Sequence, residues 1–166
     1  MDESGASQLP VVCRTWAPRG ETPALVHNFN WKMISMISGI TPTGKLYFRL
    51  FPGTIKKEQV LLFLEDLRRS VRRHLFVLWD GASPHRAKVV KAYLDDRQSR
   101  FTVFRLPPYA PDINPDEKVW SQLKHHELSN YAPRTVKELE RKVRLVLGKI
   151  GRRPGLIRSF IKDTIT

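Results

Sequence analysis

The segment that most constrains the fold is an unbroken apolar run, Leu75–Trp79, which ends at the carboxylate of Asp80. A run this short is typical of a strand buried on both faces of a sheet. Open α/β sheets place ligands at the carboxyl ends of their strands, and Asp80 falls at such an end. A second acid, Glu117, follows after 36 intervening residues, enough for one helix and one strand. Both acids are therefore expected at the same edge of one sheet.

The flanking patterns predict a mixed α/β domain. Strands are expected over 31–40, 45–51 and 101–106, the first two joined as an antiparallel hairpin. Helices are expected over 56–73, from Ser83 to about Arg97, from Asn114 onward, from Thr135 to about Leu147, and over 154–165. Residues 1–30 carry several prolines and glycines and are expected to be irregular or hairpin-like. This order predicts a mixed sheet with helices on its faces.

The charge balance points to a polyanionic partner. The 166 residues hold 29 Lys and Arg against 16 Asp and Glu, a net charge of +13. Nucleic acid is the favoured partner, and an acidic membrane surface is the alternative. No apolar run reaches the ~20 residues that span a bilayer, and no signal peptide follows Met1. Cys13 is the sole cysteine, which excludes an internal disulfide and agrees with a reducing cytoplasm.

Two long motifs carry a resemblance to a known family. One is Asp80-x-x-x-x-His85, followed by Leu-Pro-Pro-Tyr-Ala-Pro-Asp-Ile-Asn-Pro-Asp-Glu-Lys-Val-Trp over 106–120. The other is Asp2-Glu-Ser-Gly, followed by Arg-Thr-Trp-Ala-Pro-Arg-Gly over 14–20. Together they resemble the catalytic half of a DDE transposase, closest to the bacterial insertion-sequence branch of the Tc/mariner superfamily. The likeness runs from residue 2 to about residue 150.

The resemblance implies a fold and a domain plan. The fold is ribonuclease-H-like α/β, a mixed sheet flanked by helices with Asp2 on the first strand. Residues 1–166 would form a single catalytic domain, with 133–166 as a basic helical C-terminal extension. The family's N-terminal helix-turn-helix region has no counterpart here, so we expect poor specific recognition of transposon ends. A downstream reading frame, a truncated copy and a fragment are the alternatives for the chain's origin.

The resemblance also implies a chemistry. Asp2, Asp80 and Glu117 match the family's three catalytic acids, which hold two Mg²⁺ or Mn²⁺ ions. Two such ions clamp the attacking and leaving oxygens of an in-line phosphoryl displacement, and carboxylates suit Mg²⁺. The implied function is cleavage of transposon ends and strand transfer into target DNA. The implied partners are the end and target DNA and a second copy of the chain in a synaptic homodimer. No small-molecule cofactor and no membrane are expected, and the implied location is the bacterial cytoplasm, at the nucleoid.

Two of these acids have plausible structural roles instead. Asp80 could cap the helix that follows it, although Ser83 is better placed for that. Glu117 could close a capping box with Asn114 as the N-cap, and both roles could alternate. Asp116 is the adjacent alternative to Glu117 as the third acid. The match around both positions favours the catalytic interpretation.

The first acid depends on the resemblance alone. An acidic pair near a terminus is usually solvated, and Glu3 is the fallback to Asp2 as the family's first acid. Only Met1 precedes Asp2, where the family has an apolar strand, so the first strand is expected to be truncated. Backbone groups left unpaired inside the sheet cost about 1–3 kcal/mol each. We therefore expect compromised activity from this chain.

Several basic and aromatic residues are candidates for DNA contact. Arg14, Trp16 and Arg19 place an aromatic ring between two cations, which suits stacking and phosphate contact. The alternative is a surface hairpin with one buried tryptophan. His85 could contact a phosphate or a metal-bound water, or it could pack at the sheet edge. Both pairs of alternatives stay open from the sequence.

The C-terminal third adds a basic surface. From residue 121 to 166 there are eleven Lys and Arg against four Asp and Glu, including Lys124, Arg141 and Lys142. Such a surface could follow the phosphate backbone without reading bases. A merely solvated helix face is the alternative.

Two other functions compete with transposition. One is a DNA-binding remnant or domesticated domain without chemistry, against which the complete Asp-Asp-Glu set argues. The other is a different ribonuclease-H-like nuclease, against which the Pro-Tyr-Ala-Pro-Asp-Ile-Asn-Pro run argues.

Overall fold

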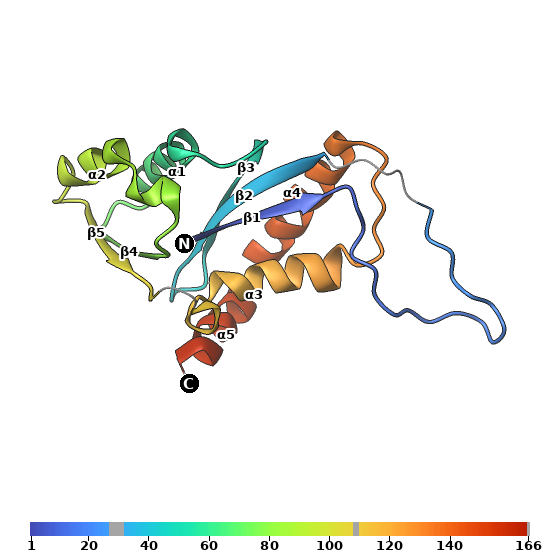
Figure 1. Cartoon of the computed structure of the whole chain (residues 1–166). Helices are drawn as coiled ribbons and strands as arrows, with labels where there is room; N and C mark the ends of the chain where they lie inside the picture. The colour runs from blue at the N-terminus through green and yellow to red at the C-terminus, as the bar shows by residue number, and fades with distance from the viewer. Residues whose placement is uncertain (27–31, 108–109, 166) are drawn as a thin grey trace.

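The computed structural model describes residues 1–26, 32–107 and 110–165, and their strands form two sheets (Figure 1). The first is antiparallel, in the order β1 (Asp2–Ser7), β2 (Met33–Ile40), β3 (Leu46–Pro52). The second is the parallel pair of β4 (Leu75–Trp79) and β5 (Phe101–Arg105). The predicted α/β class and the β2–β3 hairpin are confirmed. The expected single sheet is divided in two among these residues.

Residues 2–7 form a strand. The expectation from the resemblance that Asp2 lies on the first strand is therefore confirmed, whereas the alternative of irregular structure was wrong for these residues. The segment Asp-Glu-Ser-Gly-Ala-Ser contains no strong strand former. Its conformation comes from pairing with β2 along its whole length, from Asp2 opposite Ser38 to Ser7 opposite Met33. The predicted start of β2 at Trp31 lies outside the described residues.

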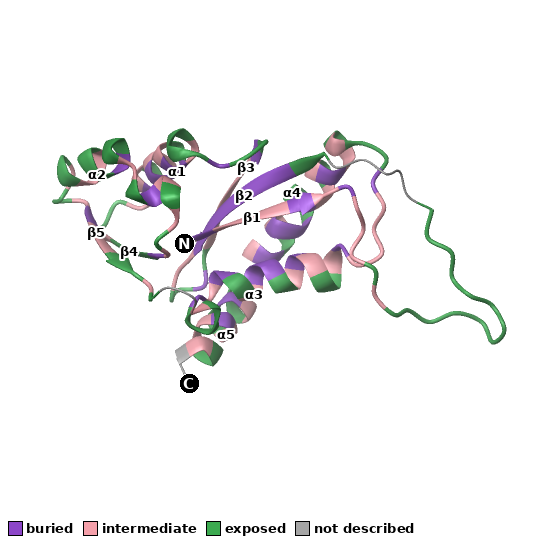
Figure 2. Ribbon diagram, in the orientation of Figure 1, coloured by how far each residue is buried: buried purple, intermediate pink, exposed green. Residues whose placement is uncertain are grey.

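The three-stranded sheet separates two apolar clusters because alternate residues of a strand face opposite sides. Ile34 and Met36 of β2 face helices α3 (Asp116–Ser121), α4 (Val136–Gly151) and α5 (Pro154–Ile165). Ile37 faces α1 (Lys57–Ser70), α2 (Lys88–Asp95) and β4. The buried positions of β2 are continuous in Figure 2, as expected for a strand covered on both sides.

Strand β4 is buried on one face only, which corrects the prediction of burial on both. Val77 and Trp79 pack into the cluster with α1 and α2, but Phe76 is 66% exposed and Leu78 is 51% exposed. On β5, Phe104 is 52% exposed and stacks on Phe76 with ring centroids 6.4 Å apart. The apolar run fills both faces of the strand, yet α1 and α2 cover just one.

The helices follow the predicted apolar stripes, with altered ends. The stripe of α1 is buried at Val60, Phe63, Leu64 and Leu67. A 3₁₀ turn, Ser83–Arg86, precedes α2, which begins at Lys88, so the prediction of a helix capped by Ser83 was wrong. Thr135 caps α4 as predicted, since its hydroxyl accepts from the Glu138 N–H at 3.1 Å. The helix continues beyond Leu147 to Gly151.

Helix α5 begins directly against the β2–β3 turn. Gly44 in that turn has φ +85°, and a Cβ built there would lie 2.5 Å from the carbonyl oxygen of Pro154. Both conditions call for glycine. Both C-terminal helices also bury apolar side chains in the cluster below the sheet, including Val143, Ile157 and Phe160. No described helix has the length and apolar character needed to cross a membrane.

Candidate active site

Asp80 lies directly after β4 with a side chain that is 46% exposed. Its Oδ1 accepts from the backbone N–H of Ala82 at 3.0 Å and lies 2.9 Å from Nδ1 of His85 as an ion pair, while the hydrogen bond of Nδ1 goes to the backbone carbonyl of Asp80 at 3.2 Å. The acid therefore stabilises the turn after the strand. Neither Asp80 nor Ser83 caps the helix that follows. Among the described residues, no group donates to the other carboxylate oxygen, Oδ2.

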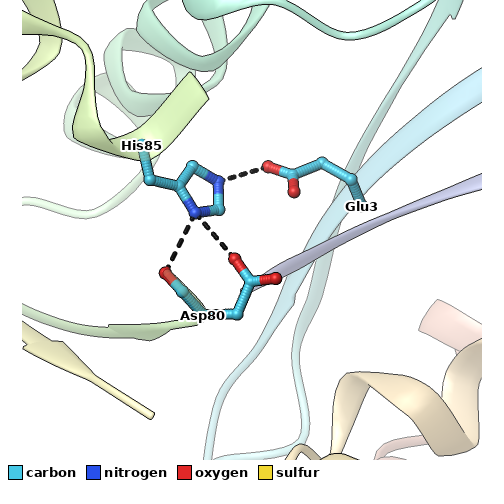
Figure 3. Close-up of side chains that lie close together, drawn as sticks. All are labelled: Glu3, Asp80 and His85. Atoms are coloured by element: carbon cyan, nitrogen blue, oxygen red, sulfur yellow. Dashed lines mark hydrogen bonds and ion pairs between the residues drawn. The ribbon is translucent and has the colours of Figure 1, made fainter. Parts of the chain in front are cut away.

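His85 is held on both sides by carboxylates (Figure 3). Its Nε2 lies 2.5 Å from Oε1 of Glu3, opposite to the nitrogen that faces Asp80. The residue is 3% exposed and its ring stacks on Trp79, with centroids 4.3 Å apart and 3° between planes. Burial of the ring lowers its pKa, but the hydrogen bond and charge of Glu3, with those of Asp80, outweigh this and raise it. This interior position favours packing over direct contact with DNA.

Asp2 is buried at the start of β1, 6% exposed. Its Oδ2 accepts from the indole N–H of Trp120 in α3 at 2.9 Å. Burial, together with the charges of Asp116 and Glu117, raises the pKa of Asp2 to about 6, while the Trp120 hydrogen bond acts in the opposite direction. Asp2 therefore lies in a group of acids at the beginning of α3.

Glu117 is exposed in the first turn of α3 and closes no capping box. The helix begins one residue later than predicted, with Pro115 rather than Asn114 at the N-cap, so Glu117 is not at the position that a capping glutamate needs. The Asn114 Oδ1 accepts instead from the Asp116 N–H at 3.3 Å. The Glu117 carboxylate is therefore exposed to solvent near Asp2. The capping alternative did not predict this position.

Asp116 is the buried member of the group. It is 1% exposed, and its Oδ1 accepts from the Ser38 hydroxyl at 2.6 Å. Its Oδ2 lies 3.0 Å from the α-amino group of Met1, which also donates to the Leu78 carbonyl of β4. The Asp116 carboxylate is therefore engaged by Ser38 and Met1 at the edge of the sheet, whereas the Glu117 carboxylate is exposed to solvent.

Strand β1 distributes its two acids to two groups. Successive residues face opposite sides, so Asp2 faces α3 with Ser38, and Glu3 faces His85 and Asp80. From the sequence, Glu3 was predicted only as the fallback to Asp2, and its pairing with His85 was not predicted. Strand alternation could have separated the two acids, but only once residues 2–7 were known to be a strand.

Comparison with known proteins identifies the family. The family model described as DDE superfamily endonuclease matches residues 1–140. The chain belongs to this family. No curated protein sequence matches it significantly.

Solved structures show that this DDE superfamily endonuclease has the fold of the Mos1 transposase catalytic domain. The mariner Mos1 paired-end complex with Mg matches with a TM-score of 0.72 at 16% identity, covering 99% of this chain and 52% of that one. A pre-cleavage Mos1 transpososome matches at 0.68 and 16%, covering 98% and 54%. The Mos1 catalytic domain alone matches at 0.55 and 16%, covering 98% and 82%. The chain thus spans about half the length of the Mos1 proteins in the complexes.

The candidate DNA-binding residues of this DDE superfamily endonuclease lie in different settings. Arg14, Trp16 and Arg19 are exposed on the long extension between β1 and β2 (Figure 2), and Trp16 is 100% exposed, so the alternative of a buried tryptophan was wrong. Lys124 reaches back to β1 and donates to the Ser4 hydroxyl at 2.7 Å.

The two candidates on α4 also differ from each other. Lys142 lies over the Tyr131 ring, 5.4 Å from its centroid, while Arg141 is exposed. On position alone, the β1–β2 extension and Arg141 are the freest to meet DNA.

Proposed function

We propose that this chain is the catalytic domain of a DDE transposase of the bacterial insertion-sequence branch, which cleaves transposon ends and joins them to target DNA. One observation carries the proposal within the family fold. Three acids come from β1, from the end of β4 and from the start of α3, the elements where the resemblance places catalytic acids. The whole of 1–166 would act as one domain, with 133–166 packed against its sheet.

Asp2, Asp80 and Glu117 are the proposed holders of two Mg²⁺ or Mn²⁺ ions. The donors fit hard cations because all three offer carboxylate oxygens. No described residue donates a hydrogen bond to Oδ2 of Asp80, and Glu117 is exposed. Burial and, to a smaller extent, the charges of Asp116 and Glu117 raise the pKa of Asp2, and a divalent cation would neutralise this clustered negative charge. Bound ions would supply charge stabilisation to the in-line displacement at phosphorus.

The protein's own part is to orient the reacting groups. In the first step, a water oxygen bonds to phosphorus and the 3′-oxygen leaves with a proton, giving a 3′-hydroxyl and a 5′-phosphate. In the second, that hydroxyl oxygen bonds to a target phosphorus and displaces the target 3′-oxygen, which takes up the proton that the hydroxyl loses. Trp120 fixes Asp2, and the turn at Ala82 fixes Asp80. Residues fixed in this way provide the positioning on which such reactions depend.

The proposed partners are two DNAs and a second copy of the chain. A net charge of +13 favours sequence-independent contact with phosphates. Mos1, whose fold this chain shares, has been solved in paired-end and strand-transfer complexes, which supports transposon ends as a partner and motivates the proposed homodimer. A location on the nucleoid in the cytoplasm would follow from these partners.

The test is Mg²⁺-dependent nicking of plasmid DNA that carries a transposon end. Asp80→Asn should reduce nicking to background because it removes a carboxylate that would hold the cation. Asp95→Asn, on the exposed side of α2, is the matched control and should keep normal activity. Nicking by the Asp80→Asn variant at the normal rate would refute the proposed chemistry. DNA binding with no nicking by the unmodified chain would favour the DNA-binding remnant.

A further inference from the structure

Each nitrogen of the His85 ring faces a different carboxylate. Nε2 meets Glu3 at 2.5 Å, and Nδ1 meets Asp80 at 2.9 Å (Figure 3). Carboxylate and carbonyl oxygens only accept hydrogen bonds, so both ring nitrogens must donate: Nε2–H to Glu3, and Nδ1–H to the Asp80 backbone carbonyl at 3.2 Å, with Oδ1 of Asp80 beside it. The result is a chain of acid, imidazole and acid that runs from β1 of one sheet to the end of β4 in the other.

A single cation held by the same three residues is the obvious alternative. One ligand atom from each lies within 4.8 Å of the others. The two carboxylates, however, are on opposite sides of the ring, so a cation on either nitrogen would replace one of the two hydrogen bonds. The short contacts at both ring nitrogens therefore favour the hydrogen-bonded arrangement of Glu3, His85 and Asp80 over a single bound cation.

We propose that Glu3 is a positioning residue that acts through His85 to fix the carboxylate of Asp80. This inference rests on the proposed role of Asp80 as a cation ligand. Oδ1 of Asp80 accepts from the Ala82 N–H and lies 2.9 Å from Nδ1 of His85, whose hydrogen bond holds the Asp80 backbone carbonyl. This leaves Oδ2 to bind. The His85 ring can hold this place only if its Nε2–H also has a partner, because a buried donor without an acceptor is costly.

Stacking completes the positioning. The Trp79 indole lies parallel to the His85 ring, 3° between planes, and so restrains rotation of the ring about its Cβ–Cγ bond. Glu3 holds Nε2 at the opposite edge of the ring from Asp80. Loss of Glu3 therefore loosens the ring and the contacts of Nδ1 with the carbonyl and Oδ1 of Asp80. Partners of this kind typically change metal affinity by about 10–100-fold.

The first experiment measures Mn²⁺ affinity by calorimetry. Glu3→Ala should weaken binding by about tenfold or more. Glu3→Gln keeps an acceptor oxygen for Nε2 and should recover part of the loss. Glu58→Gln, an exposed acid in the first turn of α1, controls for a change of charge alone and should bind normally. Circular dichroism identifies variants that have folded, and unchanged affinity in folded Glu3→Ala would overturn the proposal.

A double-mutant cycle separates positioning from direct ligation. If Glu3 acts through His85, Glu3→Ala should add almost nothing to the loss already caused by His85→Ala. If Glu3 is itself a ligand, the two losses should add in the double variant. Additive losses would therefore reject a positioning role for Glu3.

A third measurement does not require a cation. The two ring N–H protons of His85 should appear as slowly exchanging, downfield resonances in NMR spectra, since both are buried and hydrogen-bonded. Glu3→Ala should remove the Nε2–H signal and shift the Nδ1–H signal, whereas Glu58→Gln should leave both unchanged. If Asp80→Asn leaves Mn²⁺ binding unaltered, the proposed function fails, while the NMR result still decides whether Glu3 holds His85. An unchanged Nδ1–H signal in Glu3→Ala would contradict the coupling.

Discussion

The indole N–H of Trp120 donates to Oδ2 of Asp2 across 2.9 Å, which joins α3 to the first residue of β1. Trp120→Phe keeps most of the ring volume and removes the donor, so it should lower the free energy of unfolding by about 1–2 kcal/mol. Urea denaturation measures the change. Trp16→Phe is the matched control, and its fully exposed ring should give no change. Equal effects of the two substitutions would argue against the Asp2 hydrogen bond.

Acid should weaken the contacts of Glu65. Hydrogen bonds from Arg68 and Tyr93 lower the pKa of Glu65 to about 2 from its ordinary 4.5. Because the folded protein binds this proton more weakly than the unfolded chain, the stabilisation is complete above about pH 4.5 and is lost as the pH falls toward 2. Glu65→Gln should cost about 1 kcal/mol at pH 7 and almost nothing near pH 2.

Thermal unfolding at a series of pH values tests this dependence. Glu140→Gln serves as the control, since in the described part of the chain its carboxylate pairs only with Arg144, on the outer side of α4, and should contribute little at any pH. A loss that stays constant from pH 7 to pH 2 in Glu65→Gln would rule out the charged contacts as its cause.

The junction between α5 and the β2–β3 turn should tolerate no side chain at Gly44. Gly44→Ala combines a strained positive φ with a collision against Pro154, so it should cost about 2 kcal/mol or more. Gly53→Ala has a similar φ of +72° with nothing within 4 Å, and it isolates the backbone strain. Comparable losses in the two variants would show that α5 does not press on this turn.

DNA affinity should depend on the exposed extension between β1 and β2. Trp16→Ala should weaken binding to a DNA duplex with a single-stranded end by about 1–3 kcal/mol if a base stacks on the ring. Val12→Ala, on the same extension and 75% exposed, should bind normally. Fluorescence anisotropy gives both affinities, and identical values would remove Trp16 from the interface.

Binding to random duplex DNA should fall steeply with salt because of the net charge of +13. If about four phosphates are neutralised, the affinity should drop by ~100-fold between 50 and 200 mM salt. Titrations at several salt concentrations give the slope directly. A flat response would mean that the charge is not used for phosphate contact.

Local sequence patterns predicted most helices and strands. They did not predict features that depend on packing against other parts of the chain. The stripe of α1 and the cap at Thr135 are local patterns, and both are confirmed. Residues 2–7 carry no strand signal, since their conformation depends on β2. The apolar run of β4 cannot indicate how many faces are covered, because that depends on which helices pack there.

In the candidate site too, a local motif predicts some residues, whereas their contacts depend on the fold. The motif identified Asp80 and Glu117, but their surroundings arise from the fold. Sequence spacing placed Asn114 as the N-cap, whereas the structure begins α3 at Asp116. The bond between Glu3 and His85 joins residues 82 positions apart, and no local pattern predicts it.

The open apolar face of β4 and β5 bears on how the protein behaves in concentrated solution. Phe76, Leu78 and Phe104 remain more than half exposed, while a charge of +13 keeps molecules apart. Added salt screens that repulsion, and sulfate in particular strengthens apolar association. The same buffers that release DNA should therefore bring the molecules together. Purification at moderate chloride concentration, without sulfate, should keep the protein monodisperse, and light scattering across salts would map the usable range.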